Sequence, residues 1–588
     1  MKRFIPSLLA SAVAFSSLEA MAAADLVLFN GKVFTAEAGQ PRAQAIAVED
    51  GKILKVGSDA EIKALAGAST QVVDLGGKVL MPGMIDTHSH PIMGALASLR
   101  ANLYDEVKPL AELEQWIIEQ DAAGTARLDD IVVISGVSSA YWQHSRELAK
   151  RFNQGRWAEQ PLVLSGIDGH TGWANRAMLQ RVGIDATLIK GLDAKEAGYI
   201  EHESDLTPTG FLSENGWDRV RGRLPEPSAE LMLKAAREAV RVNLQVGVTA
   251  WMDAAANGGG EQSLFEMRPT ERDLGVLPLY RQLAERGELN MHVAALLLAH
   301  PQSQPDDLKV QDKVMQQFAN VPNLSFPGIK IFADGVLEFP GQTAAVIDPY
   351  NNSHKQGQLL IDPQNFGKLV AAIEQQGWIA HIHAVGDRAV RESLNAFEYA
   401  RTLKPIPVPH SISHLQLVNP KEFPRFKQLG VIASMQLLWA TAESYTEELV
   451  KPYVSAYTYR FQYPAQSLHK AGATIAGASD WPVSSPNPWN AIAQASTRSG
   501  PLGVLNSAES IDRETMFYAY TLNAAKALRL DQQIGSLAPG KQADLIVLDR
   551  DVFKVSDAEL FDTQVLTTYF AGQPVYQAAA TPDVAQAQ

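Results

Sequence analysis

The sequence predicts an α/β protein: a (β/α)8 TIM-like barrel carrying a small composite β-sandwich made from the N- and C-terminal segments. Between about residues 84 and 523, apolar strands alternate with amphipathic helices. This alternation is typical of a parallel sheet covered by helices. The number of strand–helix units favours a closed barrel over an open sheet. Both ends of the chain instead contain short alternating strands, joined near the N-terminus by Asn-Gly and Asp-Gly turns.

At the N-terminus, a signal peptide is expected over residues 1–22. Lys2 and Arg3 precede a short apolar stretch, and Ala20-Met21-Ala22 fits the A-x-A cleavage pattern. This stretch is shorter than the ~20 residues that cross a bilayer; a retained N-terminal anchor is the alternative. No later run is long and apolar enough to span a membrane. The expected location is therefore periplasmic or secreted, with cleavage near Ala22.

The next expected units are the sandwich and the barrel. Residues 23–81 and 532–578 contain the strands of the sandwich, and residues 82–531 are assigned to the barrel. The barrel segment far exceeds the ~250 residues of a minimal barrel. The excess is expected in loops, above all over residues 198–228. The apolar segments expected as strands after the first are 131–136, 161–168, 247–254, 291–298, 328–335, 379–387, 409–417, 431–437 and 474–480.

Charge and cysteine content exclude several functions. The chain has 51 basic and 65 acidic residues, a formal charge of −14. With no basic excess to neutralise phosphates, nucleic acid is not an expected partner. The chain contains no cysteine, which excludes disulfides, thiolate metal ligands and a cysteine nucleophile. A small-molecule substrate is expected, and the sequence leaves open whether the protein is a monomer or a homodimer.

The segment "VLMPGMIDTHSHP" (79–91) suggests a metal site. His88 and His90 follow an apolar strand, and residues two apart share a face of a strand. Two converging neutral imidazoles can begin a metal site. In a barrel, catalytic groups lie at the carboxyl ends of strands, and the later expected strand ends carry Lys330, His381, His383, His414 and Asp480. This sulfur-free set of nitrogen and oxygen donors suits zinc or another divalent transition metal.

These motifs resemble those of the metal-dependent amidohydrolase superfamily. "PGMIDTHSH" looks like its first-strand signature, and "GIKIFADG", "HIHAVGDRAV", "SHLQLV" and "GASDWPV" look like its later signatures. "DGHTGWANRAML" resembles a motif of the amidohydrolase 3 branch, which includes N-substituted formamide deformylase and the YtcJ-like proteins. The ending "GSLAPGKQADLIVLD" is common in such chains, and the resemblance covers essentially the whole mature chain.

The resemblance implies a role for each matching residue. His88, His90, His383 and His414 match metal ligands. Lys330 matches a lysine that is carboxylated and bridges two metals in binuclear members, and Asp480 matches an aspartate that binds metal and shuttles protons. The resemblance also favours contact of His170 and Asn175 with the substrate, with a structural hydrogen bond as the alternative. His381 shares a strand face with His383, so it is expected to contact the substrate or to support the site. From the residues alone, Lys330 could instead be a buried lysine paired with Asp334 or Glu338, and Asp480 could be a helix cap.

The predicted function is hydrolysis of a non-peptide, amide-type C–N bond of a small molecule. A divalent metal lowers the pKa of bound water from 15.7 to about 7 and polarises a carbonyl oxygen, and a nearby carboxylate can move the proton. Two alternatives remain: an esterase or lactonase using the same site, and an inactive secreted binding or regulatory protein on this scaffold. The sequence leaves open the substrate, the metal, and whether one or two ions bind.

Overall fold

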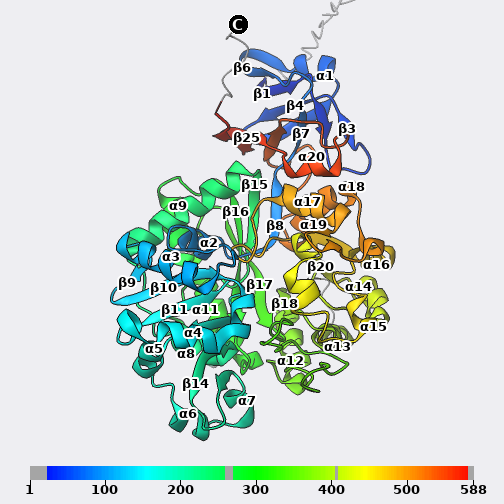
Figure 1. The fold of residues 1–588 in the computed structure, drawn as a ribbon. Helices are drawn as coiled ribbons and strands as arrows, with labels where there is room; N and C mark the ends of the chain where they lie inside the picture. Colours follow the sequence, from blue (N-terminus) through cyan, green and yellow to red (C-terminus); the bar gives the residue numbers. More distant parts are fainter. Residues whose placement is uncertain (1–22, 259–268, 404–407, 580–588) are drawn as a thin grey trace, which may run out of the picture.

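The computed structural model describes residues 23–258, 269–403 and 408–579. The predicted signal peptide lies outside these residues. The centre of the protein is an eight-stranded parallel sheet in the order β21-β20-β19-β18-β17-β16-β15-β8, wrapped by helices (Figure 1). This arrangement confirms the predicted barrel class. Its strands are β8 (Met84–Ser89), β15 (Val248–Asp253), β16 (His292–Ala299), β17 (Leu324–Phe332), β18 (Ile379–Ala384), β19 (Ser411–His414), β20 (Ile432–Met435) and β21 (Thr474–Gly477).

The first and last strands meet along a seam that closes the barrel. Thr87 Oγ1 on β8 donates a hydrogen bond to Gly477 O on β21 at 2.9 Å. One step further towards the carboxyl ends, Asp480 N donates to His88 O at 2.7 Å. The seam therefore places the residue after the last strand beside the end of the first strand.

The close approach of β17 and β18 sets the position of Lys330. A Cβ on Gly328 would lie 2.0 Å from Ile379 O, so only glycine allows the strands to lie at this distance. In the resulting register Lys330 lies opposite His381.

Two segments predicted as barrel strands belong to a different sheet. Residues 131–136 and 161–168 lie in β10 (Ile131–Val137) and β11 (Leu162–Gly166), within a six-stranded sheet inserted between β8 and β15. β10 and β11 are parallel, but β11 pairs antiparallel with the next strand, β12 (Thr171–Ala174). Their prediction as barrel strands was wrong because an apolar pattern identifies a buried strand but not the sheet it joins.

The region predicted as a loop excess, residues 198–228, belongs to the same inserted sheet. It contains two strands that pair with each other, and the second also pairs with β12. This sheet lies beside the barrel in Figure 1. The two strands of this region are β13 (Ile200–His202) and β14 (Pro208–Ser213), and β9 (Arg127–Leu128) forms the other edge of the sheet. Helix α8 (Glu214–Arg221) follows β14.

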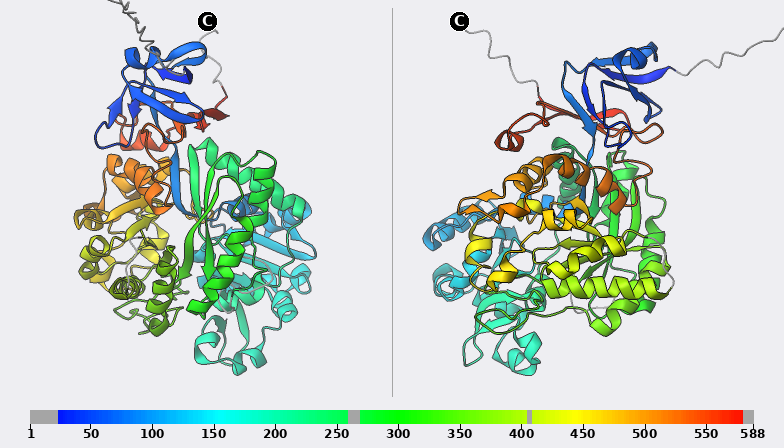
Figure 2. Two further views of the ribbon diagram at one scale, coloured as in Figure 1. Left: turned by 180° about the vertical axis from the view of Figure 1, so that it is seen from behind. Right: turned by 90° about the vertical axis from the view of Figure 1, so that its right-hand side faces the viewer.

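The two ends of the chain meet in a small β domain at one end of the barrel (Figures 1 and 2). β7 (Val79–Pro82) lies between β2 (Lys32–Phe34) and β24 (Leu545–Leu548) in a six-stranded sheet. A second sheet of four strands completes the domain, in the order β5 (Lys52–Gly57), β4 (Ala45–Glu49), β1 (Ala24–Phe29) and β6 (Ala66–Asp74). Leu26 on β1 and Leu80 on β7 belong to one buried cluster shared by the two sheets. The predicted domain boundaries stay a prediction.

The end of the barrel nearest this domain has a structural role. Helix α19 (Leu522–Ala527) contributes Ala524 and Ala525 to an apolar cluster with Ile85, at the start of β8. His292 Nε2, at the start of β16, lies 2.9 Å from Asp544 Oδ2 of the small domain. The functional groups must therefore lie at the opposite, carboxyl end of the strands, as is usual in such barrels. None of the described helices has the length and apolar character needed to cross a bilayer.

Candidate active site

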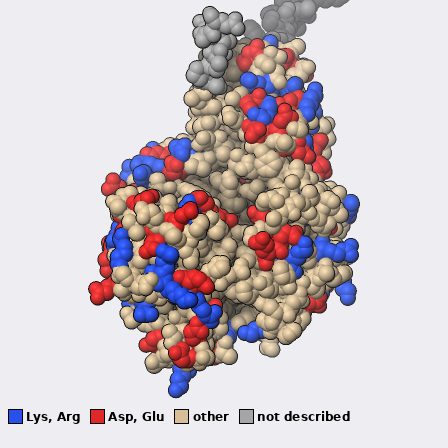
Figure 3. All heavy atoms as spheres, viewed as in Figure 1, with Lys and Arg blue, Asp and Glu red and all other residues tan. Residues whose placement is uncertain are grey.

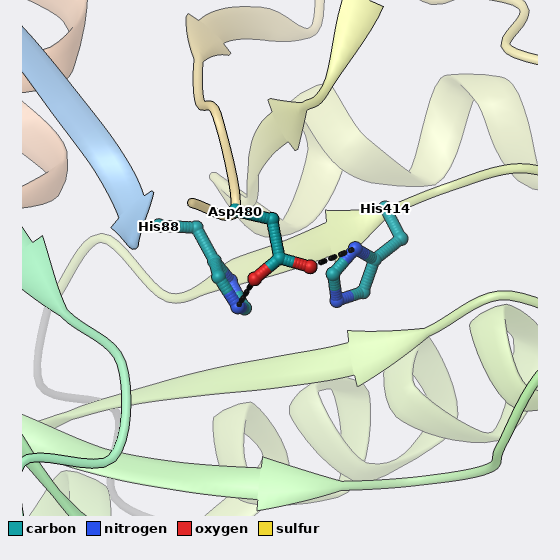
Figure 4. A group of neighbouring side chains, drawn as sticks. All are labelled: His88, His414 and Asp480. Atoms are coloured by element: carbon teal, nitrogen blue, oxygen red, sulfur yellow. Dashed lines mark ion pairs between the residues drawn. The ribbon is translucent and has the colours of Figure 1, made fainter. Parts of the chain in front are cut away.

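Buried nitrogen and oxygen donors meet at the carboxyl ends of the barrel strands. His88, His414 and Asp480 have donor atoms within 4.8 Å of one another, and the carboxylate of Asp480 points between the two imidazoles (Figure 4). Asp480 Oδ1 is 3.3 Å from His88 Nε2, and Oδ2 is 3.9 Å from His414 Nδ1. The other predicted ligands border this group: His90 Nε2 is 3.4 Å from Asp480 Oδ1, Lys330 Nζ is 3.3 Å from His88 Nε2, and the ring centroids of His383 and His414 are 4.4 Å apart.

His381 lies beneath this group and is fully buried. Its Nε2 is 2.7 Å from His88 Nδ1, and its Nδ1 is 2.7 Å from Ser411 Oγ. Both ring nitrogens are engaged by the protein, so the structure gives His381 an orienting role in place of the predicted contact with substrate. With Nδ1 of His88 held in this way, Nε2 is the atom that faces Asp480.

His414 reaches the site through an unusual backbone conformation. Its φ is 76°, in the left-handed region, which is uncommon for residues other than glycine and often marks functional positions. Neither ring nitrogen has a hydrogen-bond partner among the described residues, although the side chain is buried. Trp439 stacks on its ring at 5.6 Å. Buried polar atoms are normally satisfied, so these unpartnered nitrogens fit a metal ligand.

Four buried histidines of the site favour the neutral form. Burial lowers their pKa values well below the ordinary range, and nearby positive charge on groups such as Lys330 adds to the effect. Neutral imidazole is the form that binds metal. This holds for His88, His381, His383 and His414.

Lys330 is fully buried and lies beside His88. Burial lowers its pKa to about 7, although the charge of Asp480 acts in the opposite direction. No ion pair joins Lys330 to Asp334 or Glu338 within the described part of the chain, so the simple buried-pair alternative is not supported. Asp334 instead accepts backbone hydrogen bonds from Ala345, Val385 and Gly386.

Asp480 is a carboxylate that faces the histidines. Burial raises its pKa, but the hydrogen bond from His90 and the nearby His414 outweigh burial and hold the pKa below its usual value. Its backbone is left-handed, with φ 56°. Its side chain points to His88 and His90, so the helix-cap alternative is not supported. Together with the unpartnered His414, this donor set fits a divalent cation.

His170 extends towards the group from the inserted sheet. Its ring centroid is 5.0 Å from that of His383, and its Nδ1 is 3.0 Å from Glu214 Oε2. Burial lowers its pKa, but Glu214 outweighs burial, so the pKa of His170 lies above its ordinary value. Glu214 was not among the residues predicted from the sequence. It follows the apolar segment "FLS", and a polar residue directly after an apolar strand is the same signal that identified His88.

Asn175 is not at the site. It precedes helix α5 (Arg176–Val182), and its Oδ1 accepts hydrogen bonds from Met178 N and Leu162 N. Its Nδ2 donates to three backbone carbonyls, and the residue is fully buried. The structure therefore assigns Asn175 a structural role as a helix cap in place of the predicted contact with substrate.

A cavity of about 720 Å³ lies where the inserted sheet meets the barrel loops. It is lined by Tyr199, Glu214 and Asn215 from the inserted region, and by Gln302 and Leu360 from the barrel. On the face shown in Figure 3, a hollow separates the half that contains the inserted sheet from the opposite half, and acidic side chains lie on both sides. Glu214 is common to the cavity and to the contact with His170.

Fold and site together define a metal-dependent hydrolase on a (β/α)8 barrel. The sequence model of the Amidohydrolase family matches residues 71–576, and the chain belongs to this family. This confirms the predicted resemblance and the prediction of a metal-dependent hydrolase of carbon–nitrogen bonds.

Similar proteins match nearly the whole chain. The chain is 28% identical to Protein LONG AFTER FAR-RED 3 of Arabidopsis thaliana, over 94% of this chain and 92% of the relative. It is 25% identical to the N-substituted formamide deformylase of Arthrobacter pascens, over 94% of this chain and 98% of the relative. The solved structure of an uncharacterized metal-dependent hydrolase from Pyrococcus horikoshii has the same fold, with a TM-score of 0.68 and 22% identity. The match covers 91% of this chain and 99% of that one.

Proposed function

We propose that this protein hydrolyses a non-peptide, amide-type C–N bond of a small molecule. The observation that carries the proposal is the carboxylate of Asp480, placed between two buried imidazoles with donor atoms within 4.8 Å of one another. The similarity to an N-substituted formamide deformylase supports an amide-type substrate. The family supports metal dependence.

The metal would be held by the residues that border Asp480. Nitrogen and oxygen donors without sulfur favour zinc, and the proposal covers one or two ions. A bound divalent cation lowers the pKa of water to about 7 and polarises a carbonyl oxygen. The residues that would hold it are His88, His90, Lys330, His383, His414 and Asp480.

Lys330 is proposed to act as a carboxylated lysine. With a pKa of about 7, a substantial fraction of its amine is neutral near neutral pH, and the neutral amine can react with carbon dioxide. The new N–C bond forms as the amine loses a proton to solvent, which leaves an anionic carbamate oxygen as a ligand.

Asp480 is proposed to move the proton. Its carboxylate is ionised and lies 3.3–3.4 Å from His88 and His90, so it can accept a proton from a water beside it. The same carboxyl can then give the proton to the departing nitrogen, which makes the amine a better leaving group.

A panel of substrates tests the proposal. We expect purified protein to hydrolyse at least one of N-formyl amines, cyclic amides or acyl amino acids faster than matched esters and lactones. Metal content is determined on the same sample. Turnover of lactones or esters alone would contradict the amide assignment, and binding without turnover of any class would favour a binding protein.

Export is proposed from the N-terminal sequence. Lys2, Arg3 and the motif Ala20-Met21-Ala22 support a cleaved signal peptide. We expect the mature protein, recovered from the periplasm of a bacterial host, to begin near residue 23 when sequenced from its N-terminus. Recovery of the periplasmic protein with Met1 intact would contradict cleavage.

A further inference from the structure

We propose that the inserted sheet completes the active site through His170 and Glu214. Glu214 fixes the imidazole of His170, and His170 then contacts the substrate beside the metal-binding group. His170 would be a catalytic residue supplied from outside the barrel, and Glu214 a positioning residue that acts through it. The inference rests on the proposed hydrolase function and adds a second functional group to Asp480.

Glu214 holds His170 from two sides. Its Oε2 lies 3.0 Å from His170 Nδ1, and its backbone N donates to His170 O at 2.8 Å. Its other carboxylate oxygen accepts a hydrogen bond from Thr343 Oγ1 at 2.7 Å, from a barrel loop. The Glu214 side chain is fully buried. A buried carboxylate is retained only where it is well hydrogen-bonded, so these contacts fix both residues in one arrangement.

The backbone around Glu214 is specialised for this contact. Glu214 has φ 43°, a left-handed conformation rarely adopted by residues other than glycine. A Cβ on Gly335 would lie 2.1 Å from Glu214 Oε1, so a glycine is needed for the carboxylate to fit. Gly335 O is also 3.1 Å from His383 Nε2. One glycine therefore contacts both the Glu214 carboxylate and a predicted metal ligand.

The position of His170 points to contact with the substrate. Its ring lies 5.0 Å from the His383 ring and 5.8 Å from the Phe332 ring, measured between centroids. Because Nδ1 is engaged by Glu214, any contact of the ring with a substrate goes through Nε2. Glu214 also lines the cavity of about 720 Å³. Within the pair, Glu214 therefore borders this cavity, and His170 borders the metal-binding group through His383.

Single and double substitutions test the inference. We expect His170→Ala and Glu214→Ala each to lower kcat/KM, Glu214→Ala by about 10–100-fold, the range for loss of a group that orients a functional histidine. Metal content should be unchanged in both. If Glu214 acts through His170, the double variant should lose no more than His170→Ala alone. Glu214→Gln keeps an oxygen that accepts from Nδ1 and should recover part of the activity.

A second buried His–Glu pair supplies the matched control. His410 Nε2 lies 3.0 Å from Glu374 Oε2, and His410 Nδ1 accepts from Ala380 N, so this pair has similar geometry but lies outside the metal-binding group. Glu374→Ala should lower the melting temperature without changing kcat/KM of the folded protein. Two results would overturn the inference. In one, the losses of kcat/KM from His170→Ala and Glu214→Ala multiply in the double variant. In the other, Glu214→Ala behaves like Glu374→Ala and changes only the melting temperature.

A readout independent of turnover separates this inference from the proposed function. With histidine-selective ¹⁵N labelling, Nδ1 of His170 should carry a proton in the parent and in Glu214→Gln, and the Nδ1 signal should shift in Glu214→Ala. A parent protein that hydrolyses no substrate would overturn the proposed function and the substrate contact together. An Nδ1 signal unaffected by Glu214→Ala would overturn the positioning role whatever the activity.

Discussion

Asp480→Asn is expected to lower kcat by about 10²–10⁴-fold, the typical cost of losing general acid–base assistance. The substitution keeps the size of the side chain and one oxygen beside His88, His90 and His414, but removes the base. At least one metal ion should be retained and the melting temperature should change little. The measurement is kcat on the best substrate of the panel, with metal content and thermal melting of the same preparation.

The outcome separates an enzyme from a binding protein. A protein that only binds its ligand has no rate to lose, so Asp480→Asn would change no turnover. If Asp480→Asn hydrolyses the substrate as fast as the parent, Asp480 is not the proton carrier. His170, an ionisable group that reaches the metal-binding group from the inserted sheet, would then be tested in the same way.

His414→Ala is expected to lower metal content and to reduce hydrolysis to near the background rate. His414 has no hydrogen-bond partner among the described residues and lies against Asp480, His88 and His383. Loss of a direct ligand should weaken metal binding more than the ~10–100-fold typical of an outer partner. The measurement is metal bound per folded protein after dialysis against a defined free-metal concentration.

His410→Ala is the matched control for His414→Ala. Both histidines are buried on or near β19, but His410 is satisfied by Glu374 and Ala380. His410→Ala should destabilise the protein, because it leaves a buried carboxylate without that partner, while folded protein keeps its full metal content. Full metal content in His414→Ala, or equal metal loss in both variants, would contradict the assignment of His414 as a ligand.

Much of the fold follows from local sequence patterns. Strand–helix alternation predicts the barrel because each unit buries one apolar strand under one helix. The inserted sheet could not be separated from the barrel in this way. β10 and β11 are apolar and parallel like barrel strands, and only the antiparallel pairing of β11 with β12 distinguishes them. That pairing depends on contacts between distant segments.

The candidate site was predictable where polar residues end apolar strands. His88, His90, Lys330, His383, His414 and Asp480 were named from the sequence, and the structure brings them together. Strand alternation alone does not place His414 or Asp480, since both reach the site through left-handed backbone conformations. For Asn175 and His381 the sequence left a structural role and a contact with substrate both open, because their hydrogen-bond partners come from other parts of the chain. These partners are the backbone around residues 152–162 and His88.

The central claim is that bound metal and hydrolysis depend on each other. The most direct measurement follows metal content and turnover of the best substrate on one sample, through chelation and then stepwise return of zinc. We expect the active protein to contain one to two equivalents of divalent metal, to lose turnover in proportion to the metal removed, and to recover turnover as zinc returns. Protein that is fully active without bound metal would contradict the account.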